Sequence, residues 1–452
     1  MYSGTPSRTN GDPMRRLGCI ADDFTGATDV ASALASVGRD VVVAFGPQRL
    51  TGSEFADADA VVIALKSRTA PVGECVSDVL DAARALRAWG ATQFYLKYCS
   101  TFDSTSDGNI GPSIDALLAE LGLPTALAAP SYPANGRTVY QGHLFVGHER
   151  LDESPMRDHP LTPMRDSQLR RLLEPQTALP VANLFLDEVR AGAETIREAL
   201  APASPRTVIA DAIDDDDLRA LARASAPHVL LTGGAGLALG LGAEGEAADR
   251  PLPHGAPQGG RLVVSGSASS KTRSQIAHAR SELPSRKLDL RRLAAGESLA
   301  PELADWVVEQ WATEAHRPVL VYATDSLDDL AALPTDERAG VADRIERTLA
   351  DLAAATLDHG LGAVLVAGGE TSGRVVQTLG IDAIRIGPQL APGVVWAEAA
   401  VAPAGAAAGD GSADPAPPTR SAPAQTRRIA IALKSGNFGD ERLFTDAWEQ
   451  LR

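Results

Sequence analysis

Cysteine and histidine are scarce in this chain of 452 residues, and neither stands in a metal-binding pattern. The three cysteines, Cys19, Cys75 and Cys99, are widely spaced without a Cys-x-x-Cys, and the eight histidines include no His-Glu-x-x-His. Zinc sites of the common kinds need such spacings. An odd, scattered set of cysteines is typical of a reducing compartment. We therefore predict a cytoplasmic protein without a zinc framework.

Long apolar runs and P-loops are absent as well. No uncharged apolar run reaches the ~18 residues of a membrane helix, and residues 1–14 lack the apolar core of a signal peptide. The motif Gly-x-x-x-x-Gly-Lys-Ser/Thr does not occur, which excludes a P-loop ATPase. The net charge of -16 argues against nucleic acid or an anionic membrane as a partner, although local basic groups can still bind a small anion.

The hydrophobic and charged fractions, 44% and 22%, are ordinary for a globular protein, and the length favours two or three domains. Apolar segments alternate with helical patterns in both halves. This alternation predicts an α/β fold with two domains, each with a mainly parallel sheet flanked by helices, and a cleft between them. Composition divides the chain into a disordered N-terminus (1–14), a first domain (15–240), a Gly/Pro-rich linker (241–260) and a second domain (261–452) containing a flexible Ala/Pro-rich insertion (398–428). Residues 138–185 are interpreted as irregular.

Basic side chains follow the predicted strands of the first half. There are four of them at strand ends: Lys66, Arg68, Lys97 and Arg137. Ligands of parallel sheets bind beyond the carboxyl ends of the strands, and an anion in a cleft must be paired and hydrogen-bonded. Any one of these residues alone is more often a surface charge. Four of them in an acidic chain favour a pocket for a small carboxylate.

Three carboxylates belong to the same predicted rim: Asp22, Asp23 and Asp103. They could orient sugar hydroxyls, accept a proton from an attacking hydroxyl or hold magnesium. A helix is predicted directly after Asp22 and Asp23, so helix capping by Asp23, with Asp22 solvated, explains this pair equally well. The residues themselves leave both interpretations open.

The second half contains three glycine- and serine-rich turns, each directly after an apolar strand: Ser265–Ser267, Gly368–Ser372 and Ser435–Gly439. After the middle turn, a helical pattern opens behind Gly373. Backbone N–H groups in such turns point toward an anion, and a helix start adds partial positive charge. An ordinary βα turn is the alternative for any one of them. Three in one domain favour the seat of a nucleotide phosphate.

Several segments together resemble the four-carbon acid sugar kinase family. Residues 20–29, Ile-Ala-Asp-Asp-Phe-Thr-Gly-Ala-Thr-Asp, resemble its N-terminal signature, and residues 367–373 and 433–439 look like its C-terminal nucleotide-domain motifs. Four further segments look most like the 3-oxo-tetronate kinases within the family: 65–68, 97–105, 135–142 and 159–164. The resemblance covers roughly residues 15–445, and its long motifs are specific.

The resemblance implies an ATP-dependent kinase for the 4-hydroxyl of a 3-oxo-tetronate, either 3-dehydro-erythronate or 3-dehydro-threonate. The first domain would bind the sugar acid, and the second would bind ATP with Mg²⁺. Carried over by motif, the ATP contacts are Ser265, Gly368, Gly369, Glu370, Thr371 and Gly436. The segment 398–428 is longer and richer in Ala and Pro than the family pattern.

The resulting hypothesis gives each rim a role. Substrate binding is assigned to four side chains: Arg68, Lys97, Ser100 and Arg137. One of the three aspartates accepts the C4 proton, the others orient hydroxyls, and domain closure aligns donor and acceptor. No residue is assigned as a metal ligand. A D-threonate or D-erythronate kinase and a non-catalytic sugar-acid binding protein remain alternatives, and the base and a homodimer stay undecided.

Overall fold

The computed structural model describes residues 16–47, 50, 52–159, 162–201, 204–225, 227–242, 251–326, 329, 335–401 and 427–451. The predicted disordered segment 1–14 lies outside these ranges, as do residues 243–250 and 402–426 of the predicted linker and insertion. Below, the first half means residues 16–242 and the second half means residues 251–451.

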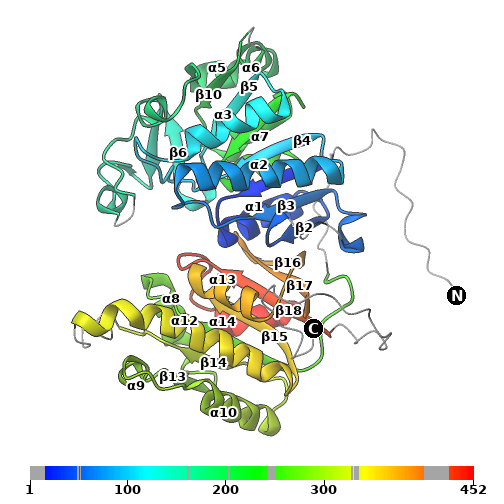
Figure 1. Cartoon of the computed structure of the whole chain (residues 1–452), viewed down its shortest axis with the longest axis vertical. Coiled ribbons are helices and arrows are strands. Elements are labelled where there is room, and N and C mark those ends of the chain that lie inside the picture. The colour runs from blue at the N-terminus through cyan, green and yellow to red at the C-terminus, as the bar shows by residue number, and fades with distance from the viewer. Residues whose placement is uncertain are drawn as a thin grey trace, which may run out of the picture.

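The two halves form two bodies, one above the other in Figure 1, and each has a mainly parallel sheet with helices on both faces. The strands of the first half follow one another in the sheet as β2 (Val41–Ala44), β3 (Ala60–Ala64), β1 (Leu17–Ala21), β4 (Gln93–Lys97), β11 (Val229–Gly233), β5 (Thr125–Ala129), β10 (Arg206–Ala210) and β9 (Val181–Leu184). Its helices are α1 (Phe24–Ser36), α2 (Val72–Trp89), α3 (Ile110–Leu121), α4 (Leu169–Leu173), α5 (Leu186–Ala191), α6 (Ala193–Leu200) and α7 (Asp215–Ala224).

The strands of the first half are apolar throughout because both faces of the sheet are covered. In β1, Cys19 packs in one core with Val30 of α1, whereas Ile20 packs in another core with Val79 of α2. Alternate residues of a strand point to opposite faces. A strand between two helix layers must therefore be apolar at every position, as the sequence of β1 is.

The second half repeats this arrangement. Its strands follow one another as β13 (Ser285–Lys287), β14 (Val319–Tyr322), β12 (Gly260–Ser265), β15 (Leu361–Ala367), β18 (Arg427–Lys434), β17 (Val394–Val401) and β16 (Ala383–Ala391). Its helices are α8 (Ser270–Ala279), α9 (Leu290–Ala294), α10 (Ala300–Thr313), α12 (Thr335–Leu357), α13 (Gly369–Thr378) and α14 (Leu443–Asp446). Short 3-10 helices complete the chain: η2 (Ser53–Phe55), η3 (Pro133–Asn135), η4 (Pro155–Asp158), η5 (Glu174–Gln176), η6 (Ala235–Gly240) and η7 (Ala447–Leu451).

One strand pairing joins the two sheets into a single sheet of 15 strands within the described residues. β16 of the second half pairs antiparallel with β2 of the first half, with Ala383 opposite Ala44 and Arg385 opposite Val42. Arg385 also forms an ion pair with Asp40 at 2.6 Å. Figure 1 shows β16 and β17 between the two bodies, with α13 next to them. The halves are therefore joined by sheet hydrogen bonds as well as by the linker.

One segment that is predicted to lack regular structure contains strands. Residues 138–185, predicted to be irregular, contribute to an antiparallel three-stranded sheet of β6 (Arg137–Tyr140), β7 (His143–Val146) and β8 (Glu149–Arg150). Val139 and Leu144 are buried there, so even these short strands have a core-facing side. Alternation over only three or four residues is too short to stand out from the surrounding proline and charge.

The predicted insertion and linker are also wrong at their edges. Residues 398–401 end β17 and residues 427–428 begin β18, where Ala399 is fully buried in the sheet. Where both faces of a sheet are covered, a strand can consist largely of alanine. Its composition is then the same as that of a low-complexity loop, and composition alone does not distinguish the two. In the predicted linker, Leu252 is buried in a core that includes Trp396. Across the part of the chain that the structure describes, no helix has both the length and the apolar composition of a membrane span.

Candidate active site

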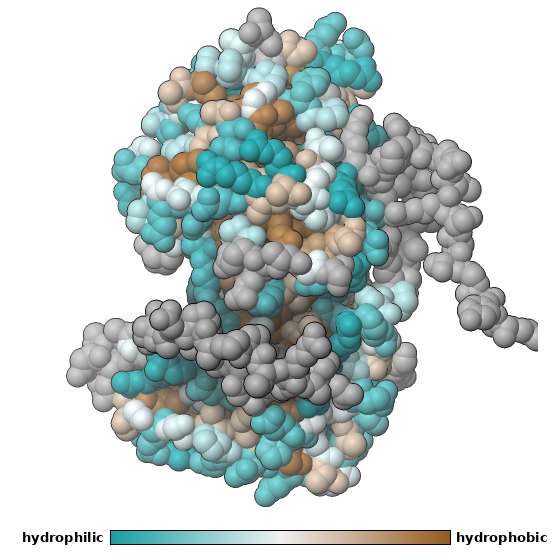
Figure 2. Space-filling model, turned by 45° about the vertical axis from the view of Figure 1, so that its right-hand side comes forward, coloured by the Kyte–Doolittle hydropathy of each residue, from teal (hydrophilic) through white to brown (hydrophobic). Residues whose placement is uncertain are grey.

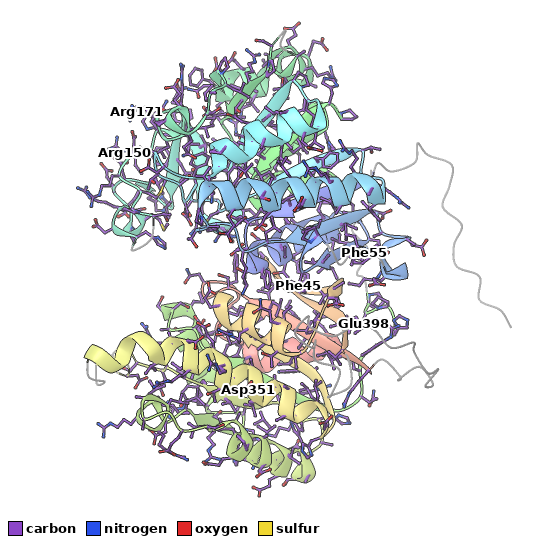
Figure 3. The ribbon with its side chains drawn as sticks, viewed as in Figure 1. Phe45, Phe55, Arg150, Arg171, Asp351 and Glu398 are labelled. Atoms are coloured by element: carbon purple, nitrogen blue, oxygen red, sulfur yellow. The ribbon has the colours of Figure 1, made fainter. Side chains whose placement is uncertain are left out.

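A cavity of about 400 Å³ lies between the two halves. The first half lines it with the end of β1, the start of α1 and the turn after β3, and the second half lines it with the start of α13. The space-filling view in Figure 2 is hollowed at the waist between the bodies. In Figure 3, Phe45 lies at this waist, and its ring packs 4.9 Å from that of Phe24, which lines the cavity. Both halves therefore contribute to one cavity.

Backbone hydrogen bonds bring three strand ends of the first half together around Asp22. The Asp22 N–H donates to the Lys97 carbonyl at the end of β4. The Asp22 carbonyl accepts from the N–H groups of Ser67 and Arg68, just after β3. The ends of β1, β3 and β4 therefore meet at one point, as expected for neighbouring parallel strands.

The carboxylates of Asp22 and Asp23 share the guanidinium of Arg68. Arg68 Nε and Nη2 each donate to Asp22 at 2.8 Å, and Nη2 lies 2.9 Å from Asp23 Oδ1. Such a fork-shaped contact fixes both partners. Arg68 was predicted to pair with the substrate carboxylate, but here it is already paired with two aspartates.

The two aspartates differ in what else they do. Asp23 caps α1, because its Oδ1 accepts from the Gly26 N–H at 2.7 Å and its Oδ2 accepts from the Thr25 hydroxyl at 3.0 Å. Burial acts to raise the pKa of Asp23, but the charges of Arg68 and Lys97, with these hydrogen bonds, hold it below its ordinary value. Burial raises the pKa of Asp22 above its ordinary value, against the opposing charge of Arg68.

Asp103 lines the same cavity from a strained turn after β4. The preceding residue, Phe102, is fully buried with φ at 53°, a left-handed conformation that costs a bulky side chain roughly 1–3 kcal/mol. Its ring packs edge-on against Tyr98, at 5.5 Å and 89°. The Thr101 hydroxyl donates to Asp103 at 2.6 Å. The turn thus holds Asp103 close to the Asp22 cluster.

The other predicted substrate residues lie outside the set that lines this cavity. Lys97 is only 3% exposed, and its Nζ donates to the Tyr98 carbonyl at 2.9 Å. Ser100 lies beside Gly234, and Arg137 donates to the Asn135 carbonyl while its Nε is buried without a partner. The structure brings Asp22, Asp23, Asp103 and Arg68 together at the surface of the cavity and leaves Lys97 one layer deeper.

Asp29 was not predicted as a site residue, although it ends the signature at residues 20–29. It is 7% exposed, and its Oδ1 has no hydrogen-bond partner. Burial raises its pKa to about 6, partly opposed by the charges of Lys97 and Arg137 and by a hydrogen bond from Tyr132. A Cβ on Gly393, in the β16–β17 turn, would lie 2.9 Å from Asp29 Oδ1. The sequence contains no signal that Asp29 lies between the halves, and only the folded structure places it there.

We expect Asp29→Asn to stabilise the protein at neutral pH. The pKa of about 6 in the folded protein lies above the ordinary aspartate value of 3.8, so the protonated form is favoured on folding. The stabilisation that the protonated carboxyl group contributes is fully present below pH 4 and is lost as pH rises through 6. This loss lowers the free energy of unfolding of the wild type by up to about 3 kcal/mol at pH 8. Denaturant unfolding at pH 4 and pH 8 should show the gain at pH 8 only. An equal effect at both pH values, or a less stable variant at pH 8, would contradict this assignment.

Three neighbouring strand ends meet in the second half, where β12, β15 and β18 lie side by side. The N–H groups of Gly266 and Ser267 donate to the Ala367 carbonyl, and the Gly368 N–H donates to the Lys434 carbonyl. The three predicted phosphate turns are therefore in contact with one another. All six predicted ATP contacts lie in or at the start of these turns.

The turn after β18 is fixed by hydrogen bonds that one of its carbonyl groups accepts. The Gly436 carbonyl accepts from Ser269 Oγ at 2.6 Å, from Thr272 Oγ1 at 2.9 Å and from Lys434 Nζ at 3.0 Å. Lys434 is 0% exposed, and its Nζ also donates to Thr272 Oγ1. Burial lowers its pKa to about 7, and the charge of Lys271 adds to this shift. A buried ammonium group at these turns was not among the predicted contacts.

The helix after β15 begins earlier than predicted. α13 starts at Gly369, so Glu370 and Thr371 belong to its first turn, whereas the pattern had suggested a start after Gly373. Gly368 precedes it with φ at 125°, a conformation that glycine adopts readily. A Cβ on Gly266 would lie 2.3 Å from Thr371 Oγ1, so this approach requires glycine.

Two buried hydroxyls beside this helix start have no hydrogen-bond partner: Ser265 Oγ at the end of β12 and Ser372 Oγ in α13. Unpaired buried polar atoms are rare and call for an explanation. The first N–H groups of α13 have no intrahelical partner either, and they carry partial positive charge. Free donors at a positive helix end are what an anion such as a phosphate requires.

Comparison with known proteins matches each half to a different family model. Residues 17–241 match a sugar-binding N-terminal domain, and residues 262–444 match a nucleotide-binding C-terminal domain. A 3-oxo-tetronate kinase from Cupriavidus necator is 44% identical over 96% of this chain and 97% of its own length. One from Pseudomonas fluorescens is 42% identical over 98% and 99%. The chain belongs to the four-carbon acid sugar kinase family.

Solved structures agree with this membership. A protein of Salmonella typhimurium LT2, named as a tRNA synthase, superposes with a TM-score of 0.82 at 38% identity, covering 96% of this chain and 99% of its own. A Haemophilus influenzae protein superposes with a TM-score of 0.77, also at 38% identity, covering 96% and 100%. The predicted fold class and family are confirmed, and the chain is a sugar-acid kinase. The individual site residues stay predictions.

Proposed function

We propose that this member of the four-carbon acid sugar kinase family transfers the γ-phosphoryl group of ATP to the 4-hydroxyl of a 3-oxo-tetronate, giving the 4-phosphate. The observation that carries the proposal is the shared cavity, in which Asp22, Asp23 and Asp103 face the first turn of α13. A kinase needs a group that accepts the hydroxyl proton within reach of the phosphate to be transferred. The names of the curated relatives support this choice of substrate.

The second half supports a phosphate-binding role through its backbone. The three turns after β12, β15 and β18 meet at one place, and α13 directs free N–H groups and a partial positive charge toward the cavity. Ser265, Gly368, Gly369, Glu370, Thr371 and Gly436 are the proposed ATP contacts. Donors fixed in advance by sheet and helix can stabilise the charge that develops during phosphoryl transfer without having to reorganise.

The first half would hold the acid and activate its hydroxyl. We assign proton acceptance to Asp22, because burial raises its pKa, whereas the pKa of Asp23 is held below its ordinary value, and this makes Asp22 the stronger base. Asp103 would orient the C4 hydroxyl. Substrate carboxylate binding is proposed for Arg68, Lys97, Ser100 and Arg137. For Lys97 and Arg137, this requires the acid to reach deeper than the open cavity, toward the buried, unpaired Arg137 Nε.

Magnesium fits the same proposal. Mg²⁺ keeps several waters and is held by one or two carboxylates together with substrate phosphates. Glu370, in the first turn of α13, and the aspartates across the cavity offer such oxygens, and the described residues contain no cluster of three or more potential metal ligands. When bound, the ion would neutralise charge on the transferring phosphate. Glu370 is the residue that we propose would hold it.

The decisive experiment is an ADP-release assay with ATP, Mg²⁺ and a panel of four-carbon acids. We expect turnover with a 3-oxo-tetronate and at least tenfold lower kcat/KM with D-threonate and D-erythronate, because a tetrahedral C3 alcohol places its oxygen and the neighbouring C4 hydroxyl differently from a planar oxo group. A preference for either reduced acid would move the assignment to that kinase. ADP formation with none of the acids would leave only the binding-protein alternative.

A further inference from the structure

Lysine is used sparingly in this chain, which has 42 basic residues of which only five are lysine. One of the five, Lys287, lies in β13 and forms ion pairs with Asp325 and Asp329. The other four are found at the strand and helix ends around the candidate active site: Lys66, Lys97, Lys271 and Lys434. Lysine presents a compact charge that the planar fork of arginine does not reproduce. Lys97 and Lys434 are buried, whereas Lys66 is exposed and lines the cavity.

Lys66 extends from the first half to the phosphate-binding helix of the second. It follows β3, and its Nζ lies 5.2 Å from the centre of the Phe24 ring, a cation–π distance. A Cβ built on Gly373 of α13 would lie 3.5 Å from both Lys66 Cε and Nζ. The same position would lie 3.4 Å from Phe24. The ammonium group is therefore held beside the first turns of α13, and glycine at 373 leaves room for it.

The charges around Lys66 suit an incoming anion. The N-terminal end of α13 carries partial positive charge, so an ammonium group beside it is unfavourable until an anion binds between them. Arg68, on the same rim, is neutralised by Asp22 and Asp23. Within the described residues, Lys66 makes no salt bridge, although Glu346 lies close enough to interact with it through charge and Glu370 lines the same cavity. Lys66 is thus the available cation on the acceptor side.

We propose that Lys66 is a catalytic residue that contacts the phosphoryl group during its transfer, from the side of the acceptor hydroxyl. This inference rests on the proposed kinase function. In the step itself, the C4 oxygen forms a bond to the γ-phosphorus and its proton passes to Asp22. The bond from the γ-phosphorus to the bridging oxygen breaks, and ADP leaves with that electron pair. Lys66 stays protonated and donates hydrogen bonds to the equatorial oxygens, where charge is spread in the transition state.

The position of Lys66 predicts how its loss divides between binding and turnover. Lys66 belongs to the first half, so ADP bound to the second half does not depend on it. Lys66→Met should lower kcat about 100-fold, as for the loss of one donor to a transition-state anion. The Kd for ADP and the KM for the sugar acid should stay within about threefold. Lys287→Met is the matched control, because it removes a lysine far from the cavity, and it should keep wild-type kcat.

The test measures kcat, acid KM and ADP Kd for the wild type, Lys66→Met, Lys66→Gln and Lys287→Met, each with its thermal midpoint. A fall in kcat of more than tenfold in both Lys66 variants, with ADP affinity and thermal midpoint unchanged, supports the inference. A smaller fall, or one matched by equal loss of ADP affinity, overturns it. A wild type that forms no ADP with any four-carbon acid overturns the proposed function as well, so the two failures can be told apart.

Discussion

Asp22→Asn should lower kcat for ATP-dependent phosphorylation about 10³-fold, because it removes the group that we propose as the acceptor of the C4 proton. General-base catalysis by a positioned side chain contributes about 10²–10⁴-fold. Arg68 Nε and Nη2 donate to the two Asp22 oxygens at 2.8 Å, and asparagine, which is close in size, can accept only one of these hydrogen bonds because its NH2 group is a donor. Asp23, whose Oδ1 lies 2.9 Å from Arg68 Nη2, should still hold the guanidinium in place. Steady-state kcat and KM for the sugar acid, measured at saturating ATP, check this.

Variants of the neighbouring aspartates separate the role of Asp22 from the roles of Asp23 and Asp103. Asp23→Asn should leave the cap of α1 nearly intact, because an asparagine oxygen can accept from the Gly26 N–H as Oδ1 does, and it should lower kcat less than Asp22→Asn. Asp103→Asn should mainly raise the KM for the acid. Asp216→Asn is the matched control, because Asp216 lies far along the chain in α7 and its side chain is 90% exposed. If Asp103→Asn and not Asp22→Asn abolishes turnover, the base is Asp103.

The pH dependence supplies a second check on the same residue. In the proposed mechanism, activity requires ionised Asp22 and is lost as pH falls through the pKa of Asp22, which burial raises above the ordinary aspartate value. The acidic limb of kcat/KM for the free enzyme should therefore lie at higher pH than an ordinary aspartate would give. In Asp22→Asn that limb should disappear from the residual activity. A limb that persists unchanged in the variant would assign it to another group.

The sequence predicts the strand ends and their polar residues well because both depend on local pattern. β1 is apolar at each position and α13 places Val375 and Val376 in the core, so the apolar pattern predicts both elements, although it misses the first turn of α13. Parallel strands bring their carboxyl ends to one edge, which accounts for Asp22 and Arg68 meeting. The convergence of the three second-half turns follows from the same rule. These parts of the site needed no knowledge of long-range contacts.

Other parts depend on contacts that no local pattern contains. The pairing of β16 with β2 joins residues more than 300 positions apart, and nothing near Ala383 signals it. The depth of Lys97, its separation from the open cavity and the burial of Asp29 are set by how α1 packs between the halves. The pairing of Arg68 with two aspartates, rather than with a substrate, likewise requires three segments to be placed at once.

Lys434→Met should change stability and nucleotide binding in opposite directions. Lys434 is 0% exposed, and within the described residues its ammonium group forms no salt bridge. Burial lowers its pKa to about 7 from 10.5, so the native state disfavours the protonated form. The cost is full below pH 7, shrinks as pH rises and vanishes above 10.5. After the loss of two hydrogen bonds of about 1 kcal/mol each, methionine should raise the free energy of unfolding at pH 7 by about 1–3 kcal/mol.

The same substitution should weaken ATP binding, because a charge kept at such a cost needs a compensating partner. Lys434 is the last residue of β18, and its carbonyl and ammonium groups bond to Gly368 and Gly436, one residue from each of two proposed phosphate turns. A triphosphate there supplies the missing negative charge. We expect Kd for ATP to rise about 30–100-fold, equivalent to roughly 2–3 kcal/mol, with sugar-acid binding unchanged. Calorimetric titration with ATP and denaturant unfolding measure both quantities, with Lys287→Met as the control. A variant that is less stable and binds ATP normally would show that Lys434 serves packing alone.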